Sequence, residues 1–148
     1  MARTSRTMNG LSPAQVFLAF RDGYTYDRWV VGTRNIRSAD PGWPAPGTEI
    51  HYTIGYAPLR KDDKTVACSY EPDVKLELEA HAWPAGTARI AFTVEEVDGG
   101  CVVHIDEHPL RGIAATLHNP VLDLLIKVRN VETLRRLEQR IRQMVVHR

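Results

Sequence analysis

Apolar and polar positions follow three successive patterns along this chain. After a weakly alternating segment at residues 1–8, two short stretches with helical spacing cover residues 13–22 and 24–31. Ser12 provides an N-cap for the first of them, and Pro13 follows at the first helical position. Residues 33–108 then alternate with period 2, and residues 119–148 return to helical spacing. This order predicts a strand, two short helices, a run of strands and one long C-terminal helix.

Turn residues divide the alternating region into six strands. Residues 33–40 form the first, which ends at the loop Pro41–Gly47 because its three prolines and two glycines cannot continue a strand. The other strands are predicted at residues 49–56, 65–71, 76–82, 88–95 and 101–108, with turns around 61–64, 71–73 and 98–100. Together with residues 1–8 they predict a curved, seven-stranded antiparallel sheet, since most connections are short.

The C-terminal helix carries a broad apolar stripe that we expect to lie across this sheet. Its members are Leu124, Leu125, Val128, Val131, Leu134, Leu137, Ile141 and Met144. At about 1.5 Å per residue the helix is long enough, at about 40 Å, to cross a small domain. We therefore predict a single α+β domain over residues 1–148 with a ligand cavity between sheet and helix. The residues predicted to be buried together are Leu76, Leu78, Ile90, Phe92, Leu124 and Val128.

Composition narrows the class of protein. Hydrophobic residues make up 43% of the chain and charged residues 25%, as in ordinary globular domains. No apolar run approaches the length of a membrane span, and the N-terminus leads into no apolar signal segment, so we expect a cytoplasmic protein. Cys68 and Cys101 lie in strand-like segments without metal-binding spacing, which predicts two free, buried thiols.

The last helix is basic, with seven Lys or Arg and three Asp or Glu from residue 119 onward. However, 123–127, 132–136 and 138–142 are acid-first pairs with the i,i+4 spacing that favours ion pairs on an exposed helix face. The charges therefore predict a solvated surface. Specific nucleic-acid binding is not expected, and a transient contact with an anionic membrane stays open.

Most candidate metal-binding or acid–base residues lie in one segment, residues 104–108. His104 and His108 share a strand face but lie about 13 Å apart, too far to hold one metal ion, so we expect no metal site. Glu107 follows Val103 and Ile105 on the inward face. It either pairs with Arg111 or Arg129 or faces a ligand, where it could act as an acid or base. Tyr52 and Tyr56 also point inward from their strand.

Three segments of the chain resemble one known group of proteins. Tyr26–Gly32, Asp40–Gly47 and Arg129–Leu137 are similar to the SRPBCC superfamily, in an actinobacterial-type subgroup. These START-like, helix-grip proteins include polyketide cyclases and dehydratases, lipid-transfer domains and the birch-pollen allergen type. The resemblance implies a hydrophobic cavity between the sheet and the last helix. It supplies no shared catalytic residue and no cofactor.

The leading hypothesis is a carrier or sensor of a hydrophobic small molecule such as a lipid, polyketide or isoprenoid, acting as a monomer or weak dimer. The predicted ligand-binding residues are Trp29, Tyr52, Tyr56, Leu78, Phe92, Glu107, Ile113, Leu124 and Val128. Ligand access is predicted between the loop Pro41–Gly47 and residues 109–117. Two alternatives stay open. One is a cyclase or dehydratase that uses Glu107 or a tyrosine, and the other is a regulatory module that binds a partner through the basic helix face or the Trp43 loop.

Overall fold

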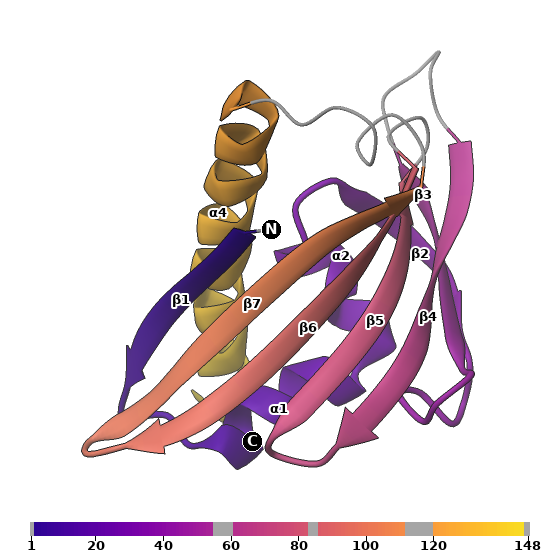
Figure 1. Cartoon of the computed structure of the whole chain (residues 1–148). Helices are drawn as coiled ribbons and strands as arrows, with labels where there is room; N and C mark the ends of the chain where they lie inside the picture. The colour runs from indigo at the N-terminus through magenta and orange to yellow at the C-terminus, as the bar shows by residue number, and fades with distance from the viewer. Residues whose placement is uncertain (1, 55–60, 83–85, 112–119, 147–148) are drawn as a thin grey trace.

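The computed structural model of the chain describes residues 2–54, 61–82, 86–111 and 120–146. Its seven strands form one antiparallel sheet in the order β1-β7-β6-β5-β4-β3-β2, and the long helix α4 stands against the β1 edge (Figure 1). The predicted fold class is confirmed. The elements are β1 (Ala2–Asn9), α1 (Pro13–Arg21), the 3-10 turn η1 (Gly23–Thr25), α2 (Tyr26–Trp29), β2 (Thr33–Ala39), β3 (Glu49–Ile54), β4 (Lys61–Glu71), β5 (Lys75–Ala82), β6 (Gly86–Val97), β7 (Gly100–Arg111) and α4 (Pro120–Val146).

Helix α1 begins where the sequence places it. The Ser12 hydroxyl accepts a hydrogen bond from the Gln15 backbone N–H, and the Gln15 side chain accepts one from the Ser12 N–H, which forms a capping box. The second predicted helix is shorter than expected, because residues 23–25 form a 3-10 turn and only Tyr26–Trp29 is α-helical. These short helices lie inside the curl of the sheet and support its concave face (Figure 1).

The turn predicted at residues 61–64 is wrong. These residues are the first four of β4, and they pair in register with β3, Lys61 opposite Ile54 and Lys64 opposite His51. Four charged residues in succession are typical of a turn, but here Lys61 and Asp62 are exposed and Lys64 forms an ion pair with Glu49 at 3.3 Å. A strand with solvated side chains tolerates such a run.

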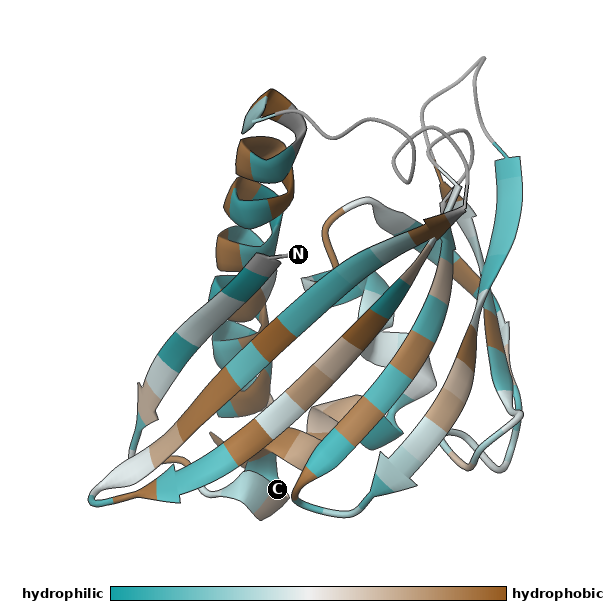
Figure 2. Ribbon diagram, viewed as in Figure 1, coloured by the Kyte–Doolittle hydropathy of each residue, from teal (hydrophilic) through white to brown (hydrophobic). Residues whose placement is uncertain are grey.

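The core lies between the concave face of the sheet and helices α1 and α2. Apolar and polar residues alternate along β5 and β6 (Figure 2), and Leu76, Leu78 and Phe92 point inward and are buried. The ring of Phe92 lies 4.9 Å from that of Phe20 and 5.8 Å from that of Trp29, measured between centroids. Aromatic packing thus joins the sheet to both helices.

Helix α4 packs against β1, α1 and α2 through its C-terminal half. Leu134, Leu137 and Ile141 are at most 1% exposed, whereas Leu124 and Val128 are 60% and 58% exposed. The prediction that these two residues are buried with the sheet residues is therefore wrong. At about 100° per residue, the buried stripe continues from Leu134 toward the N-terminus through Asn130, and Val128 lies about 160° away from Asn130 around the helix. The N-terminal half of α4 extends past β1 (Figure 1), and its apolar residues Leu124, Leu125 and Val128 are exposed.

Two further expectations concern membrane and redox chemistry. In the described part of the chain, no helix combines the length and apolar character needed to cross a membrane. Both cysteines are free; Cys101 is buried as predicted, but Cys68 is only half-buried.

Candidate functional site

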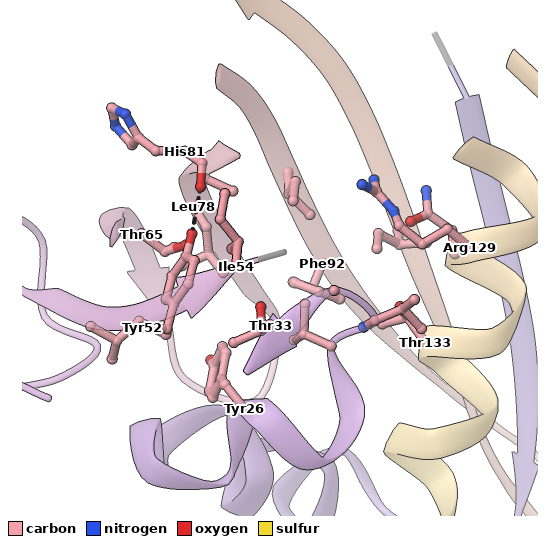
Figure 3. A pocket seen from close by; sticks show the side chains of 18 residues that line it. Tyr26, Thr33, Tyr52, Ile54, Thr65, Leu78, His81, Phe92, Arg129 and Thr133 are labelled. Atoms are coloured by element: carbon pink, nitrogen blue, oxygen red, sulfur yellow. Dashed lines mark hydrogen bonds between the residues drawn. The ribbon is translucent and has the colours of Figure 1, made fainter. Parts of the chain in front are cut away.

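A cavity of about 300 Å³ lies between the concave face of the sheet, the end of α2 and the middle of α4. Its wall is mostly apolar and is formed by Val30, Ile50, Ile54, Leu78, Ile90, Phe92 and Ile105. Polar groups lie at two sides. Tyr52, Thr65 and His81 come from the sheet, while Arg129, Asn130 and Thr133 come from α4 (Figure 3).

The predicted ligand-binding residues differ in their placement. Tyr52, Leu78 and Phe92 line the cavity, whereas Trp29 is fully buried and packs on Phe20 and Phe92. Glu107 is 5% exposed and contacts the cavity residue Arg129. Tyr56 and Ile113 lie outside the described residues.

Leu124 and Val128 are exposed and do not line the cavity, because the rotation of α4 about its axis places Asn130 on the buried side instead. The cavity instead meets the polar stretch of α4 at Arg129, Asn130 and Thr133.

Tyr52 forms a polar cluster whose hydrogen bonds are complete. Its hydroxyl lies 2.8 Å from the His81 carbonyl oxygen, 2.9 Å from the Lys64 carbonyl oxygen and 2.9 Å from the Thr65 hydroxyl. The phenol donates its one proton to a carbonyl, and the Thr65 hydroxyl can donate to the phenol. Burial raises the pKa of Tyr52 to about 12, so the group is a neutral phenol near pH 7.

Tyr26 and Trp43 meet at one backbone carbonyl. The Tyr26 hydroxyl donates to the Phe20 carbonyl oxygen at 2.8 Å, and the Trp43 indole N–H donates to the same oxygen at 3.0 Å. Burial raises the pKa of Tyr26 as well. Trp43 is 7% exposed, so the loop Pro41–Gly47 is anchored in the core and does not present its tryptophan to a partner.

The predicted access route runs between Pro41–Gly47 and residues 109–117. Pro41–Gly47 joins β2 to β3 beyond the pair Ala39–Ile50, and Pro109 lies on β7 opposite Ala88. Residues 112–117 lie outside the described part of the chain, so the access route stays a prediction.

Glu107 links the sheet to α4. Val103, Ile105 and Glu107 are buried on the inward face of β7, as their alternation predicts. Of the two partners considered, Arg129 is the one that the structure shows, since its Nη2 donates to Glu107 Oε1 in an ion pair. The positive charge at the cavity is thus opposed by a buried negative one.

The outward face of β7 holds the histidines. His104 lies 2.6 Å from the Ser5 hydroxyl and 3.4 Å from the Glu95 carboxylate, and Asp106 pairs with Arg3 at 3.0 Å. Within the described ranges, no three His, Cys, Asp or Glu side chains gather as a metal site requires. The absence of a metal stays a prediction.

The basic surface of α4 is largely paired. Glu132 and Arg136 are 2.8 Å apart and Glu138 and Arg142 are 2.7 Å apart, which confirms two of the three predicted i,i+4 pairs. Glu138 also accepts a hydrogen bond from Arg6 of β1 at 2.6 Å, and this contact ties the helix to the edge strand.

Asn130 was missed by sequence reasoning. It is 2% exposed and lines the cavity, and its Nδ2 has no hydrogen-bond partner in the described structure. The available signal was its spacing, because Asn130 lies four and seven positions before the buried Leu134 and Leu137.

Comparison with solved structures identifies the class of fold. Ara h 8.0201 superposes with a TM-score of 0.73 at 13% identity, over 96% of this chain and 97% of that one. The Staphylococcus aureus protein SA2116 gives 0.65 at 10% identity, over 99% and 96%. DynU16, from the dynemicin biosynthetic locus, gives 0.68 at 12% identity, over 93% of this chain and 45% of its own.

The chain therefore has the helix-grip fold of Bet v1-like and SRPBCC proteins. No protein-family model matches its sequence, and no curated protein does. At 10–13% identity these likenesses establish the fold.

Proposed function

We propose that this protein binds a hydrophobic small molecule, such as a lipid, polyketide or isoprenoid, as a carrier or sensor. The observation that supports this most directly is the cavity of about 300 Å³ with its apolar wall. This volume lies at the lower end of the usual range for ligand pockets. Burying about 200 Å² of apolar ligand surface would contribute roughly 5 kcal/mol at 25 cal/mol per Å², before the cost of association.

The titratable groups favour binding over catalysis. A cyclase or dehydratase needs an acid or base whose pKa lies near the working pH. Tyr52 has a pKa of about 12, and burial also raises the pKa of Tyr26. The Glu107 carboxylate is engaged by Arg129. The enzyme alternative therefore has weaker support than the carrier.

The partner-binding alternative has weaker support too. Trp43 is buried, and Arg136 and Arg142 of the basic helix face are paired with carboxylates. Such surface pairs are worth little energy, but they reduce the net positive charge that the helix presents to an anionic partner.

The test is a fluorescence titration with the neutral apolar probe N-phenyl-1-naphthylamine. Ala80 lines the cavity on the inward face of β5, so Ala80→Phe fills part of the space. Ala91, between inward-facing Ile90 and Phe92 on β6, points to the other face, and Ala91→Phe is the matched control. We expect saturable binding by wild type and Ala91→Phe, and at least tenfold weaker binding by Ala80→Phe. Thermal melting checks that both variants are folded.

Two results would refute the proposal. A wild-type protein that shows no saturable fluorescence change has no accessible apolar cavity. Equal affinities of a folded Ala80→Phe variant and the wild type would place the bound probe elsewhere on the molecule.

A further inference from the structure

The polar groups around the cavity are not equally satisfied. On the sheet side, the Tyr52 hydroxyl already has Lys64, Thr65 and His81 as partners. The close view shows the ring of His81 turned away from the cavity, with its carbonyl oxygen toward Tyr52 (Figure 3). This Tyr52 cluster therefore offers a ligand no unused donor.

Asn130, on the α4 side, is the exception. It lines the cavity and is 2% exposed, yet its Nδ2 donates to no group in the described structure. Buried polar side chains in folded proteins nearly always have a hydrogen-bond partner. An unpaired amide in a cavity wall is therefore a position at which a ligand can supply the missing acceptor.

The neighbours of Asn130 determine the charge of the group that fits. Arg129, the preceding residue, also lines the cavity, and its guanidinium uses one N–H to bind Glu107. A guanidinium has five N–H donors, so others remain for a ligand. Because Glu107 is 5% exposed and neutralises Arg129, an additional carboxylate would meet a buried like charge. An ammonium group would meet Arg129 and the amide donor of Asn130.

We propose that the ligand presents a neutral oxygen acceptor, such as a ketone, an ester carbonyl or an alcohol, to Asn130 and Arg129. Its apolar body lies against Leu78 and Phe92. This assignment rests on the proposed ligand-binding function and specifies the ligand class and its orientation. Asn130 supplies the recognition hydrogen bond, and the Arg129–Glu107 pair sets the preference for an uncharged head group.

The test compares ligands of one shape by calorimetric titration. The set is 2-acetylnaphthalene, 2-ethylnaphthalene, 2-naphthoate and 1-(2-naphthyl)ethylamine, which present a ketone, a hydrocarbon, an anion and a cation. In wild type we expect the ketone to bind about tenfold more tightly than the hydrocarbon, as one hydrogen bond to an unpaired donor allows. The two charged ligands should bind more weakly than the ketone. A wild type that binds the anion or the cation more tightly than the ketone would overturn the proposal.

Variants at Asn130 isolate its role. Asn130→Leu should remove the preference for the ketone while leaving the affinity for 2-ethylnaphthalene within about twofold. Its melting temperature should equal or exceed that of wild type, because an unpaired polar group is lost from the interior. Gln139→Leu, an amide replaced at an exposed position of the same helix, should keep the preference. If Asn130→Leu fails to fold, Asn130→Ala serves instead, since it removes the donor without adding a charge beside Glu107.

The role of the Glu107 charge is tested with Glu107→Gln. This variant keeps an acceptor for Arg129 but removes the negative charge. This variant should bind 2-naphthoate at least tenfold more tightly than wild type, with little change for the ketone. Retention of the ketone preference in the Asn130 variant, or no gain for the anion in Glu107→Gln, would refute the assignment. The N-phenyl-1-naphthylamine titration has no carbonyl requirement. Continued probe binding in that case would leave the ligand-binding function intact.

Discussion

Truncation of two leucines on the same helix tests how α4 packs. Leu134 is 1% exposed in contact with the core, and Leu124 is 60% exposed three turns earlier. Leu134→Ala and Leu124→Ala make the same chemical change in the same helix, so the small gain in helix propensity on going to alanine is common to both. Any difference in stability therefore reports tertiary packing.

The expected magnitudes are well separated. A leucine removed from a packed interior loses its transfer free energy and leaves a cavity, which costs about 2–5 kcal/mol in the free energy of unfolding. An exposed leucine should cost less than about 0.5 kcal/mol. For a chain of this size, about 3 kcal/mol corresponds to a decrease in Tm of roughly 6–12 °C.

Urea denaturation followed by far-ultraviolet circular dichroism measures both variants. We expect a large decrease in the midpoint for Leu134→Ala and almost none for Leu124→Ala, with unchanged slopes. Equal losses would mean that the N-terminal half of α4 packs on the protein as closely as the C-terminal half. The rotation of the helix derived above would then be wrong.

Two further predictions concern titratable groups. Burial would raise the pKa of Glu138, but hydrogen bonds from Arg6 and Arg142 outweigh it and hold the pKa below its ordinary value of 4.5. The stabilisation is therefore present above that value and is lost as pH falls through the lower folded pKa, so Glu138→Gln should cost up to about 1 kcal/mol at pH 7 and much less near pH 2 in urea titrations. Tyr52→Phe removes the phenol that donates to one of the Lys64 and His81 carbonyl oxygens and should cost about 1–2 kcal/mol in the free energy of unfolding, while probe affinity stays within threefold. In an alkaline titration followed by phenolate absorbance, Tyr52→Phe should show one tyrosine fewer than the wild type near pH 12. A phenol that titrates near pH 7 in the wild type would contradict the assignment of Tyr52 as a neutral group.

The strand residues of the cavity were predictable because a strand has only two faces. Once Leu76 and Leu78 are assigned inward, period 2 places every other residue of β5, and the same holds for Phe92 on β6 and Glu107 on β7. Tyr52, Leu78 and Phe92 therefore line the cavity that the alternation predicted. The wrong turn at 61–64 has the opposite cause, since charge alone does not distinguish a solvated strand from a turn.

The helix residues were less predictable because a helix can rotate continuously about its axis. In the first half of α4, Leu124, Leu125 and Val128 form the more apolar face, so pattern reasoning assigns it to the interior. The structure buries Asn130 and leaves those residues exposed, because the register is set by Leu134, Leu137 and Ile141 in the second half. Only the tertiary contacts of that half reveal the rotation.

This conflict between local pattern and burial is itself informative. Positions at which a buried residue contradicts the hydrophobic pattern are expected at functional sites, since a sequence selected for packing alone would avoid them. Leucine at position 130 would extend the buried stripe, yet the chain holds an amide there, without a partner for its Nδ2 and beside the Arg129–Glu107 pair. The three residues come from neighbouring positions on α4 and from β7, and they meet at the side of the cavity where the Asn130 amide is unpaired in the described structure. Stability gives no reason for this arrangement, whereas recognition of an oxygen-bearing apolar ligand does.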